Sequence, residues 1–185
     1  MTNTVETAID SFLSFKLGDE LFAANVAKVL EILELAKITK VPKSPEYMRG
    51  VINLRGNVLP VVDTRIKFGM PVTKDTVNTC IVVLDINMEG ESLMVGILVD
   101  SVQEVLELQD DEIKPPPSIG SRYKSDFIQG MVKKEEEFIM ILNIDAVLSS
   151  EEISSILRET KDEIAKIDGE EPEEGKPKRK TTKKN

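Results

Sequence analysis

One ten-residue pattern occurs twice in this chain and constrains the fold more than any other feature. Residues 26–35 and 99–108 both read V-x-x-V-x-E-h-L-E-L, where h is Ile or Val. A proline follows each copy, and then a hairpin-like segment that contains Gly50 in one case and Gly130 in the other. The order of elements is the same through roughly 60 residues of each copy. Chance likeness between β-rich segments is the alternative, but the matched order indicates a duplication.

A single copy of this size can bury little of its own apolar surface. Two copies can share a core along the seam between them. A long period with only two copies is typical of a duplicated domain and not of a solenoid. We therefore expect two small, pseudo-symmetric β-barrels that share one elongated apolar core and leave a groove between them.

Four pairs of short apolar segments with turn residues between them predict an all-β fold. One pair flanks Gly56-Asn57, a dipeptide that can adopt positive φ. Short strands at regular spacing favour barrels or a sandwich over a helical fold. The paired segments are residues 12–17 with 21–24, 51–55 with 58–62, 79–86 with 93–99, and 130–133 with 138–142.

Changes in composition along the chain predict its organisation. Ser149 and Glu152 form a capping-box pattern before apolar residues at helical spacing, which predicts a C-terminal helix. Beyond it, an acidic block and then a basic block cannot bury apolar surface. We expect a flexible lead at 1–10, the domain at 11–148 with copies at about 11–70 and 76–148, a helix at 149–168 and a disordered charged tail at 169–185. Exchange of terminal strands between the copies is left open.

The composition excludes much of enzyme chemistry. The chain has no histidine, and Cys80 is its only cysteine. Ser-His-Asp and Cys-His arrangements are therefore impossible, as is a structural zinc site of the usual kind, and we expect no metal and no cofactor. The lone cysteine fits a reducing cytoplasm, and the longest apolar runs are too short to insert into a membrane.

A nucleic-acid-binding module of the OB-like type is the less favoured alternative. Barrels of that type need basic grooves and stacking aromatic side chains to hold a strand. This chain has a formal net charge of −9 and only 4% aromatic residues. We therefore expect no specific nucleic-acid partner.

Residues 51–65, VINLRGNVLPVVDTR, resemble the signature of the CheW family, the coupling proteins of bacterial chemotaxis. Two other blocks, 45–50 and 97–102, fit the same family pattern, so the resemblance extends over roughly residues 11–150. Thr64 stands where a typical member has leucine. The resemblance implies two five-stranded barrels similar to SH3 or OB barrels.

The resemblance also implies a function. Members are non-enzymatic adaptors that bridge the cytoplasmic tip of chemoreceptors, the methyl-accepting chemotaxis proteins, to the regulatory domain of the histidine kinase CheA. It implies a cytoplasmic protein that is monomeric in isolation and is recruited with its partners into arrays at the inner face of the membrane. A coupling protein of a chemosensory-like pathway with another output is the alternative within the same class.

An ion pair between Glu31 and Arg55 is expected near the groove, because both residues lie in apolar surroundings. The alternative is two unrelated surface charges. The resemblance associates both positions with receptor binding and signalling. The second copy has Glu104 at the position that matches Glu31, but Glu135 at the position that matches Arg55. The pair is therefore not expected to be a mere consequence of the fold.

Four further candidates for receptor or kinase contact are Val29, Val105, Gly50 and Gly96. The two valines lie in the repeated pattern, where core packing is an equal alternative and where the resemblance places the receptor groove. Gly50, which matches Gly130, is expected to serve a positive φ or a close approach of backbone. Gly96 interrupts an apolar strand, which indicates a bulge or a close neighbour.

A basic cluster of Arg49, Arg65 and Lys67 stands out in an otherwise acidic chain. We interpret it as a solvated face, which is the commoner role for such a group.

Overall fold

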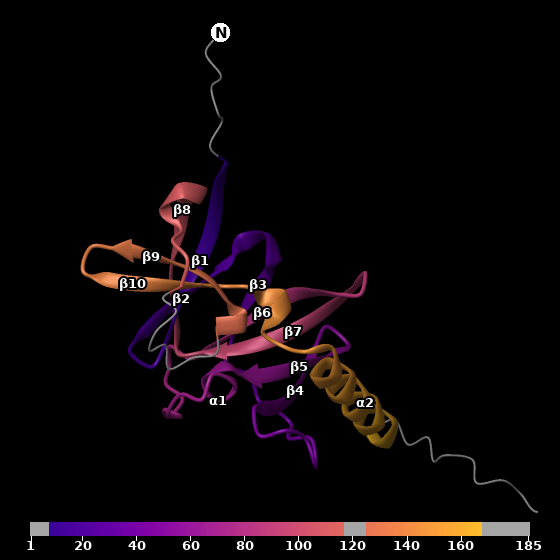
Figure 1. Cartoon of the computed structure of the whole chain (residues 1–185). Helices are drawn as coiled ribbons and strands as arrows, with labels where there is room; N and C mark the ends of the chain where they lie inside the picture. Colours follow the sequence, from indigo (N-terminus) through magenta and orange to yellow (C-terminus); the bar gives the residue numbers. More distant parts are fainter. Residues whose placement is uncertain (1–7, 117–124, 168–185) are drawn as a thin grey trace, which may run out of the picture.

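Two five-stranded sheets make up the body of the protein, which confirms the expected all-β class (Figure 1). The computed structural model describes residues 8–116 and 125–167. The first sheet has the strand order β8-β1-β2-β10-β9 and the second has the order β3-β6-β7-β5-β4. The strands are β1 (Ile9–Leu17), β2 (Glu20–Asn25), β3 (Val29–Glu34), β4 (Met48–Leu54), β5 (Asn57–Asp63), β6 (Cys80–Met88), β7 (Glu91–Val99), β8 (Ser101–Gln109), β9 (Ile128–Lys134) and β10 (Glu137–Leu142). The helical segments are α1 (Thr64–Lys67), α2 (Ser150–Ile167) and the short 3₁₀ turns η1 (Val26–Lys28), η2 (Asp110–Glu112), η3 (Ser125–Phe127) and η4 (Ile144–Ala146).

Each sheet contains strands from both copies of the repeat. The first copy supplies β1 to β5 and the second supplies β6 to β10. The hairpin β1–β2 of the first copy joins β8, β9 and β10, while the hairpin β6–β7 of the second copy joins β3, β4 and β5. If each strand is replaced by its counterpart in the other copy, β1 by β6, β2 by β7 and so on, the order of the first sheet becomes the order of the second. The pseudo-symmetry is therefore exact at the level of topology, and it includes a reciprocal exchange of hairpins.

One isolated bridge closes each sheet. In the second sheet, the segment after β3 bonds to the opposite edge strand β4, with N–H to O=C distances of 2.9 and 2.8 Å between Thr39 and Val51. In the first sheet, Lys114 and Met131 make the matching pair of bonds at 2.9 and 2.8 Å. These bonds connect the two opposite edges of each sheet and close it into a small barrel.

The described residues form three apolar clusters, so a core shared by both sheets exists, but the expectation that it is the single core is wrong. The largest cluster draws on both sheets and on α2, and includes Phe15, Phe22 and Val82. A second is confined to the first sheet, where Leu106 and Ile141 belong to it. The third is confined to the second sheet. The alternation of side chains along each strand explains this division, because successive residues point to opposite faces of a sheet.

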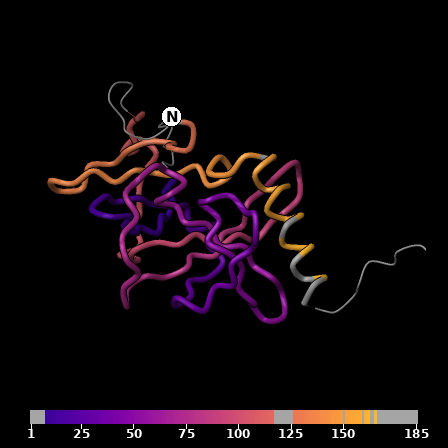
Figure 2. Tube along the Cα trace, turned by 90° about the horizontal axis from the view of Figure 1, so that it is seen from below, coloured from indigo at the N-terminus to yellow at the C-terminus, as the bar shows by residue number. Residues whose placement is uncertain are grey.

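Helix α2 begins where it was expected. Ser149 donates its backbone N–H to Glu152 Oε2 at 2.7 Å, and Ser149 Oγ accepts from the Glu152 N–H at 3.2 Å, a capping box. Ile153 and Ile156 bury the start of the helix against the largest cluster. Both views show α2 at the margin of the molecule (Figure 2).

Most of the expected lead and the charged tail lie outside the described residues. Within the described part of the chain, no helix is both long and apolar enough to cross a membrane.

Candidate binding surface

The edge strand β3 presents apolar side chains to solvent. Leu30 is 50% exposed and Ile32 is 46% exposed. Val29 and Glu31, which alternate with them along the strand, are only partly exposed, and Val29 packs against the largest cluster. Asn25 positions the start of this strand by accepting the Ala27 N–H at 2.8 Å and capping η1. The strand therefore carries an exposed apolar row on one face while its other face is anchored.

Glu31 and Arg55 form the expected ion pair. The Arg55 guanidinium donates two parallel hydrogen bonds, from Nη1 to Oε1 at 2.9 Å and from Nη2 to Oε2 at 2.7 Å. Hydrogen bonding to Glu31, with the attraction of its charge, raises the pKa of Arg55. Glu31 alternates with Leu30 and Ile32 along β3, so the pair lies on the opposite face of the strand from the apolar row and gives the same sheet edge a charged group in a fixed orientation.

The turn that carries Arg55 differs from the expectation by one residue. Leu54 pairs with Asn57, so the two-residue turn is Arg55-Gly56 and not Gly56-Asn57. Both turn residues have positive φ, 52° for Arg55 and 84° for Gly56, as a two-residue turn in a twisted hairpin requires. The Asn53 side chain accepts the Gly56 N–H at 2.8 Å and stabilises the turn.

The second copy has its own ion pair, so the expectation that the fold does not impose one is wrong. Lys134 binds Glu104, the residue that matches Glu31. The cation comes from the last residue of β9, one position before the residue that matches Arg55. The reason is geometric: the end of the hairpin lies beside this glutamate in both copies, so either of two adjacent positions can supply the cation.

The predicted glycines serve close backbone approach. A Cβ at Gly50, where φ is +143°, would overlap the carbonyl of Thr39 in the closing bridge. At Gly130 it would lie 2.8 Å from the carbonyl oxygen of Lys114 in the matching bridge. At Gly96 it would lie 2.7 Å from the Ile81 side chain, inside the apolar strands of the second sheet. Gly50 and Gly96 therefore shape the barrel that carries β3.

Val105 is the one predicted site residue that the structure does not bring to the second sheet. It lies on β8, the edge strand of the first sheet, and is 55% exposed. Its position in the repeat matches Ile32, so the two residues occupy equivalent places on two different sheet edges. Core packing is excluded for Val105, while Val29 is partly buried in the core.

The basic cluster is not a solvated face. Arg65 is completely buried. It donates to Asp63 from Nε at 2.9 Å and from Nη2 at 2.8 Å, and from Nη1 to Asp100 and to Thr73 Oγ1, each at 2.8 Å. Hydrogen bonding to Asp63 outweighs burial and raises the pKa of Arg65. We call Arg65, Asp63, Asp100 and Thr73 the Arg65 cluster.

The other two cations of the basic cluster are also paired. Arg49 donates to Asp63 at 3.2 Å and binds Asp75. Lys67 binds Glu152 and lies 4.7 Å from the centre of the Tyr47 ring. A charged residue at the end of an apolar strand, as Asp63 in β5, or directly after one, as Asp100 after β7, was the signal in the sequence that could have revealed this network.

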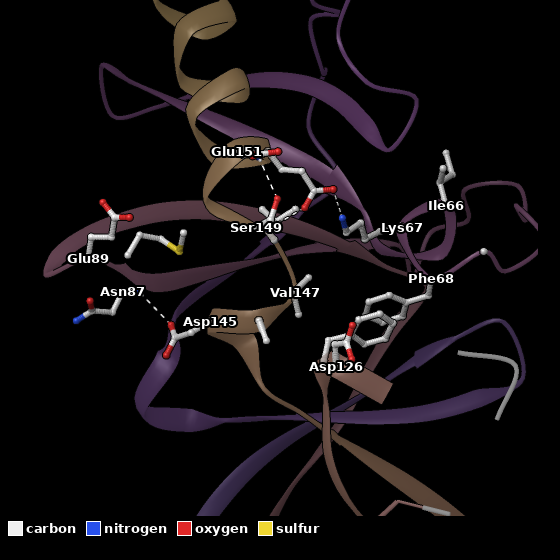
Figure 3. Close-up of a pocket in the computed structure, with 16 residues that line it drawn as sticks. Ile66, Lys67, Phe68, Asn87, Glu89, Asp126, Asp145, Val147, Ser149 and Glu151 are labelled. Carbon is white, nitrogen blue, oxygen red and sulfur yellow. Dashed lines mark hydrogen bonds and ion pairs between the residues drawn. The ribbon is translucent and has the colours of Figure 1, made fainter. Parts of the chain in front are cut away.

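A cavity of about 1080 Å³ lies where the two sheets and α2 meet (Figure 3). Phe68 and Phe127 stack in its wall with ring centres 4.2 Å apart. Asp145 accepts the Asn87 N–H at 3.0 Å on its other side. Among residues 8–116 and 125–167, no three His, Cys, Asp or Glu side chains gather closely enough to hold a metal ion.

The interlocked barrels define a duplicated β-barrel domain with one apolar sheet edge exposed at β3. The family model of the CheW-like domain matches residues 11–152, and the chain belongs to this family. The chemotaxis protein CheW of Rhizobium meliloti is 38% identical over 140 residues, which cover 76% of this chain and 88% of that protein. CheW of Klebsiella aerogenes is 32% identical over 151 residues, or 82% and 89% of the two chains.

A solved structure agrees with the assignment. The crystal structure of the scaffolding protein TtCheW from Thermoanaerobacter tengcongensis matches with a TM-score of 0.69 at 28% identity. The match covers 80% of this chain and 94% of that one. The family model and this structural match therefore agree on the duplicated barrel region.

Proposed function

We propose that this protein is a chemotaxis adaptor that couples transmembrane chemoreceptors to a CheA-type histidine kinase. The observation that carries the proposal is the family match over residues 11–152, which includes both barrels and all six predicted site residues. The relatives bear the name chemotaxis protein CheW, and the structural relative is called a scaffolding protein. The adaptor acts in the cytoplasm, is monomeric in isolation, and reaches the inner face of the membrane through its receptors.

The β3 edge is the surface that we assign to the receptor. An amphipathic helix can place its apolar face against an exposed apolar row such as Leu30 and Ile32. The Glu31–Arg55 pair then stands at the border of the contact, where a fixed charge sets the register of the incoming helix. The resemblance to the CheW family implies that the regulatory domain of the kinase has the same fold, and we propose that the two proteins pack barrel against barrel.

Two matched substitutions test which sheet edge binds which partner. Ile32→Asp and Val105→Asp put the same charge at equivalent, exposed positions of the two edges. Isothermal titration with the purified kinase regulatory domain, and a coupled kinase assay with receptor membranes, give the two readouts. We expect Ile32→Asp to abolish receptor-dependent kinase activation and to leave binding of the kinase domain largely intact.

The proposal has a clear contrary outcome. If the wild-type protein gives no heat and no co-elution with its cognate kinase domain at micromolar concentrations, and both proteins are folded, it is not a kinase adaptor. If neither substitution changes receptor-dependent activation, the sheet edges are not the receptor surface.

A further inference from the structure

The chain crosses between the two sheets at two points, and an ion pair stands at each. The first crossing is η1, between β2 and β3, and the second is Asp100, between β7 and β8. At the second crossing, Arg65, which follows β5, binds Asp100 at 2.8 Å. At the first crossing, Asp145, which follows β10, binds Lys28 at 3.0 Å. Residues 65 and 145 match in the repeat, whereas Lys28 matches Ser101, the residue after Asp100. The two junctions therefore lie at corresponding places in the fold, with the charges reversed and one partner displaced by a single position.

Both junctions also tie one sheet to the other. Asp100 Oδ2 accepts the backbone N–H of Gly18, in the β1–β2 turn of the first sheet, at 2.6 Å. Asp145 Oδ1 accepts the backbone N–H of Asn87, on β6 of the second sheet, at 3.0 Å. The amides of Gly18 and Asn87 therefore each report on the integrity of one junction.

The two junctions differ greatly in burial. The Arg65 side chain is 0% exposed and Asp63 and Thr73 hold it from other sides. The Lys28 and Asp145 side chains are 31% and 39% exposed. A partly exposed pair contributes less to stability and opens more readily than a buried network, which opens only with the surrounding structure.

The junctions lie at opposite ends of the seam. Asn87 pairs with Ser92 near the turn of the β6–β7 hairpin, and Asp100 follows the other end of β7. The path from Ser92 to Asp100 is eight residue-to-residue steps, a distance of roughly 26 Å at about 3.3 Å per residue. A weak junction and a strong junction at the two ends of one interface allow the barrels to pivot about the strong one.

The weak junction directly precedes the proposed receptor surface. β3 begins one residue after Lys28, and Val29 and Glu31 follow on that strand. Asp145 and Asn87 line the large cavity, so open space lies next to the pair (Figure 3). Movement at this junction therefore shifts the start of β3 relative to the other barrel.

We propose that Lys28 and Asp145 are positioning residues that form a latch between the barrels and hold the β3 edge in its binding orientation. When the Lys28–Asp145 latch opens, the barrels pivot about the Arg65 cluster and the β3 edge loses that orientation. This inference rests on the proposed function for its link to receptor binding, but the latch itself is a property of the free protein.

Amide hydrogen exchange on the free, full-length protein tests the latch. Lys28→Gln leaves Asp145 unchanged in the sequence but removes the cation that pairs with its carboxylate. We expect the exchange of the Asn87 amide to accelerate several-fold, while the exchange of the Gly18 amide stays unchanged. Lys28→Arg keeps the charge and should restore the protection of Asn87.

Lys134→Gln is the matched control. It breaks an exposed lysine–carboxylate pair within the first sheet and should leave both amides unchanged. An Asn87 amide that exchanges no faster in Lys28→Gln would overturn the latch. Equal acceleration at Gly18 would also overturn it, because that result indicates general destabilisation.

Binding of a receptor-tip fragment tests the positioning role. Lys28→Gln should weaken it because a preorganised surface is lost, and Lys28→Arg should bind like the wild type. Faster Asn87 exchange in Lys28→Gln with unchanged receptor affinity would overturn the positioning role. If the wild-type protein itself binds no receptor fragment, the proposed function fails, while the exchange result on the free protein still decides the latch.

Discussion

Arg55 occupies a backbone conformation that disfavours most side chains. Its φ of 52° is in the left-handed region, where a non-glycine residue is strained. Glu135 has the equivalent φ of 55° in the second copy, so the turn geometry belongs to the fold. The guanidinium, in contrast, is found only in the first copy. Backbone and side chain at this position therefore have separate roles that substitutions can separate.

Arg55→Ala should change function more than stability. The alanine keeps the same strained φ, and the lost ion pair is mostly exposed, so the melting temperature should stay within a few degrees. Receptor-dependent kinase activation should fall clearly, and binding of the kinase domain should fall less. Arg55→Lys keeps the charge without the two-pronged geometry and should restore activation only in part.

Arg55→Gly is the control for this prediction. It removes the guanidinium and also relieves the backbone strain, so the protein should be more stable than Arg55→Ala but equally inactive. Normal activation by Arg55→Ala, measured beside a melting curve, would contradict a role for the guanidinium in coupling.

At the scale of single residues, the sequence predicted pairs near the surface better than buried ones. Glu31 and Arg55 were identifiable because each interrupts an apolar stretch. The burial of Arg65 was not predicted, because most of its near neighbours along the chain are polar and its partner Asp100 lies 35 residues away. A buried charge depends on partners that only the tertiary structure assembles.

Helix α2 is attached to the barrels through a titratable contact. Burial raises the pKa of Glu152, but hydrogen bonds from Lys67 and Ser149 outweigh it and hold the pKa below the ordinary value of 4.5. A carboxyl group whose folded-state pKa is lowered stabilises the fold above its unfolded-state pKa. This contribution is lost as the pH falls through the folded-state value.

The Glu152 carboxylate should therefore add to the free energy of unfolding at neutral pH but not at acid pH, where it is protonated. Glu152→Gln should be less stable than the wild type at neutral pH, and the two curves should converge as the pH falls below 4.5. Urea unfolding at a series of pH values measures this. A constant difference at all pH values would mean that the substitution acts through packing and not through charge.

The closing bridge of each barrel predicts a ranking of two glycine substitutions. In Gly50→Ala the new Cβ would overlap a backbone carbonyl, and the alanine would have to adopt a positive φ. The free energy of unfolding should therefore fall by about 3 kcal/mol or more. Gly130→Ala has a φ outside the strained region and meets its bridge less closely, so it should cost about 1–3 kcal/mol. Chemical denaturation gives both values, and the reverse order would contradict the steric explanation.

At the scale of elements, local patterns predicted the hairpins but not their partners. Turn residues and alternating side chains marked each strand pair correctly to within a few residues. The sequence left the exchange of the two hairpins open. β1 pairs with β8, which lies about 90 residues away, and no local pattern encodes which distant strand it pairs with. The division of the core into three clusters follows from the same long-range pairing.

The stability of the whole molecule should depend unequally on its two junctions. Arg65→Met leaves Asp63 buried without its principal cation and should cost about 3–5 kcal/mol. Lys28→Gln breaks a partly exposed pair and should cost less, about 1 kcal/mol. Unfolding in urea compares them directly, and similar costs would mean that the two junctions are equally strong.

The exchange of hairpins has a consequence for the origin of the chain. A half-length ancestor with five strands could not complete either barrel alone, because its first hairpin would have no sheet to join. Two identical ancestors could each lend that hairpin to the other and form a symmetric swapped dimer. Fusion of the two genes would then have made the association independent of concentration. It would also have freed the two halves to diverge, so that one junction has a buried arginine while the other has a partly exposed lysine.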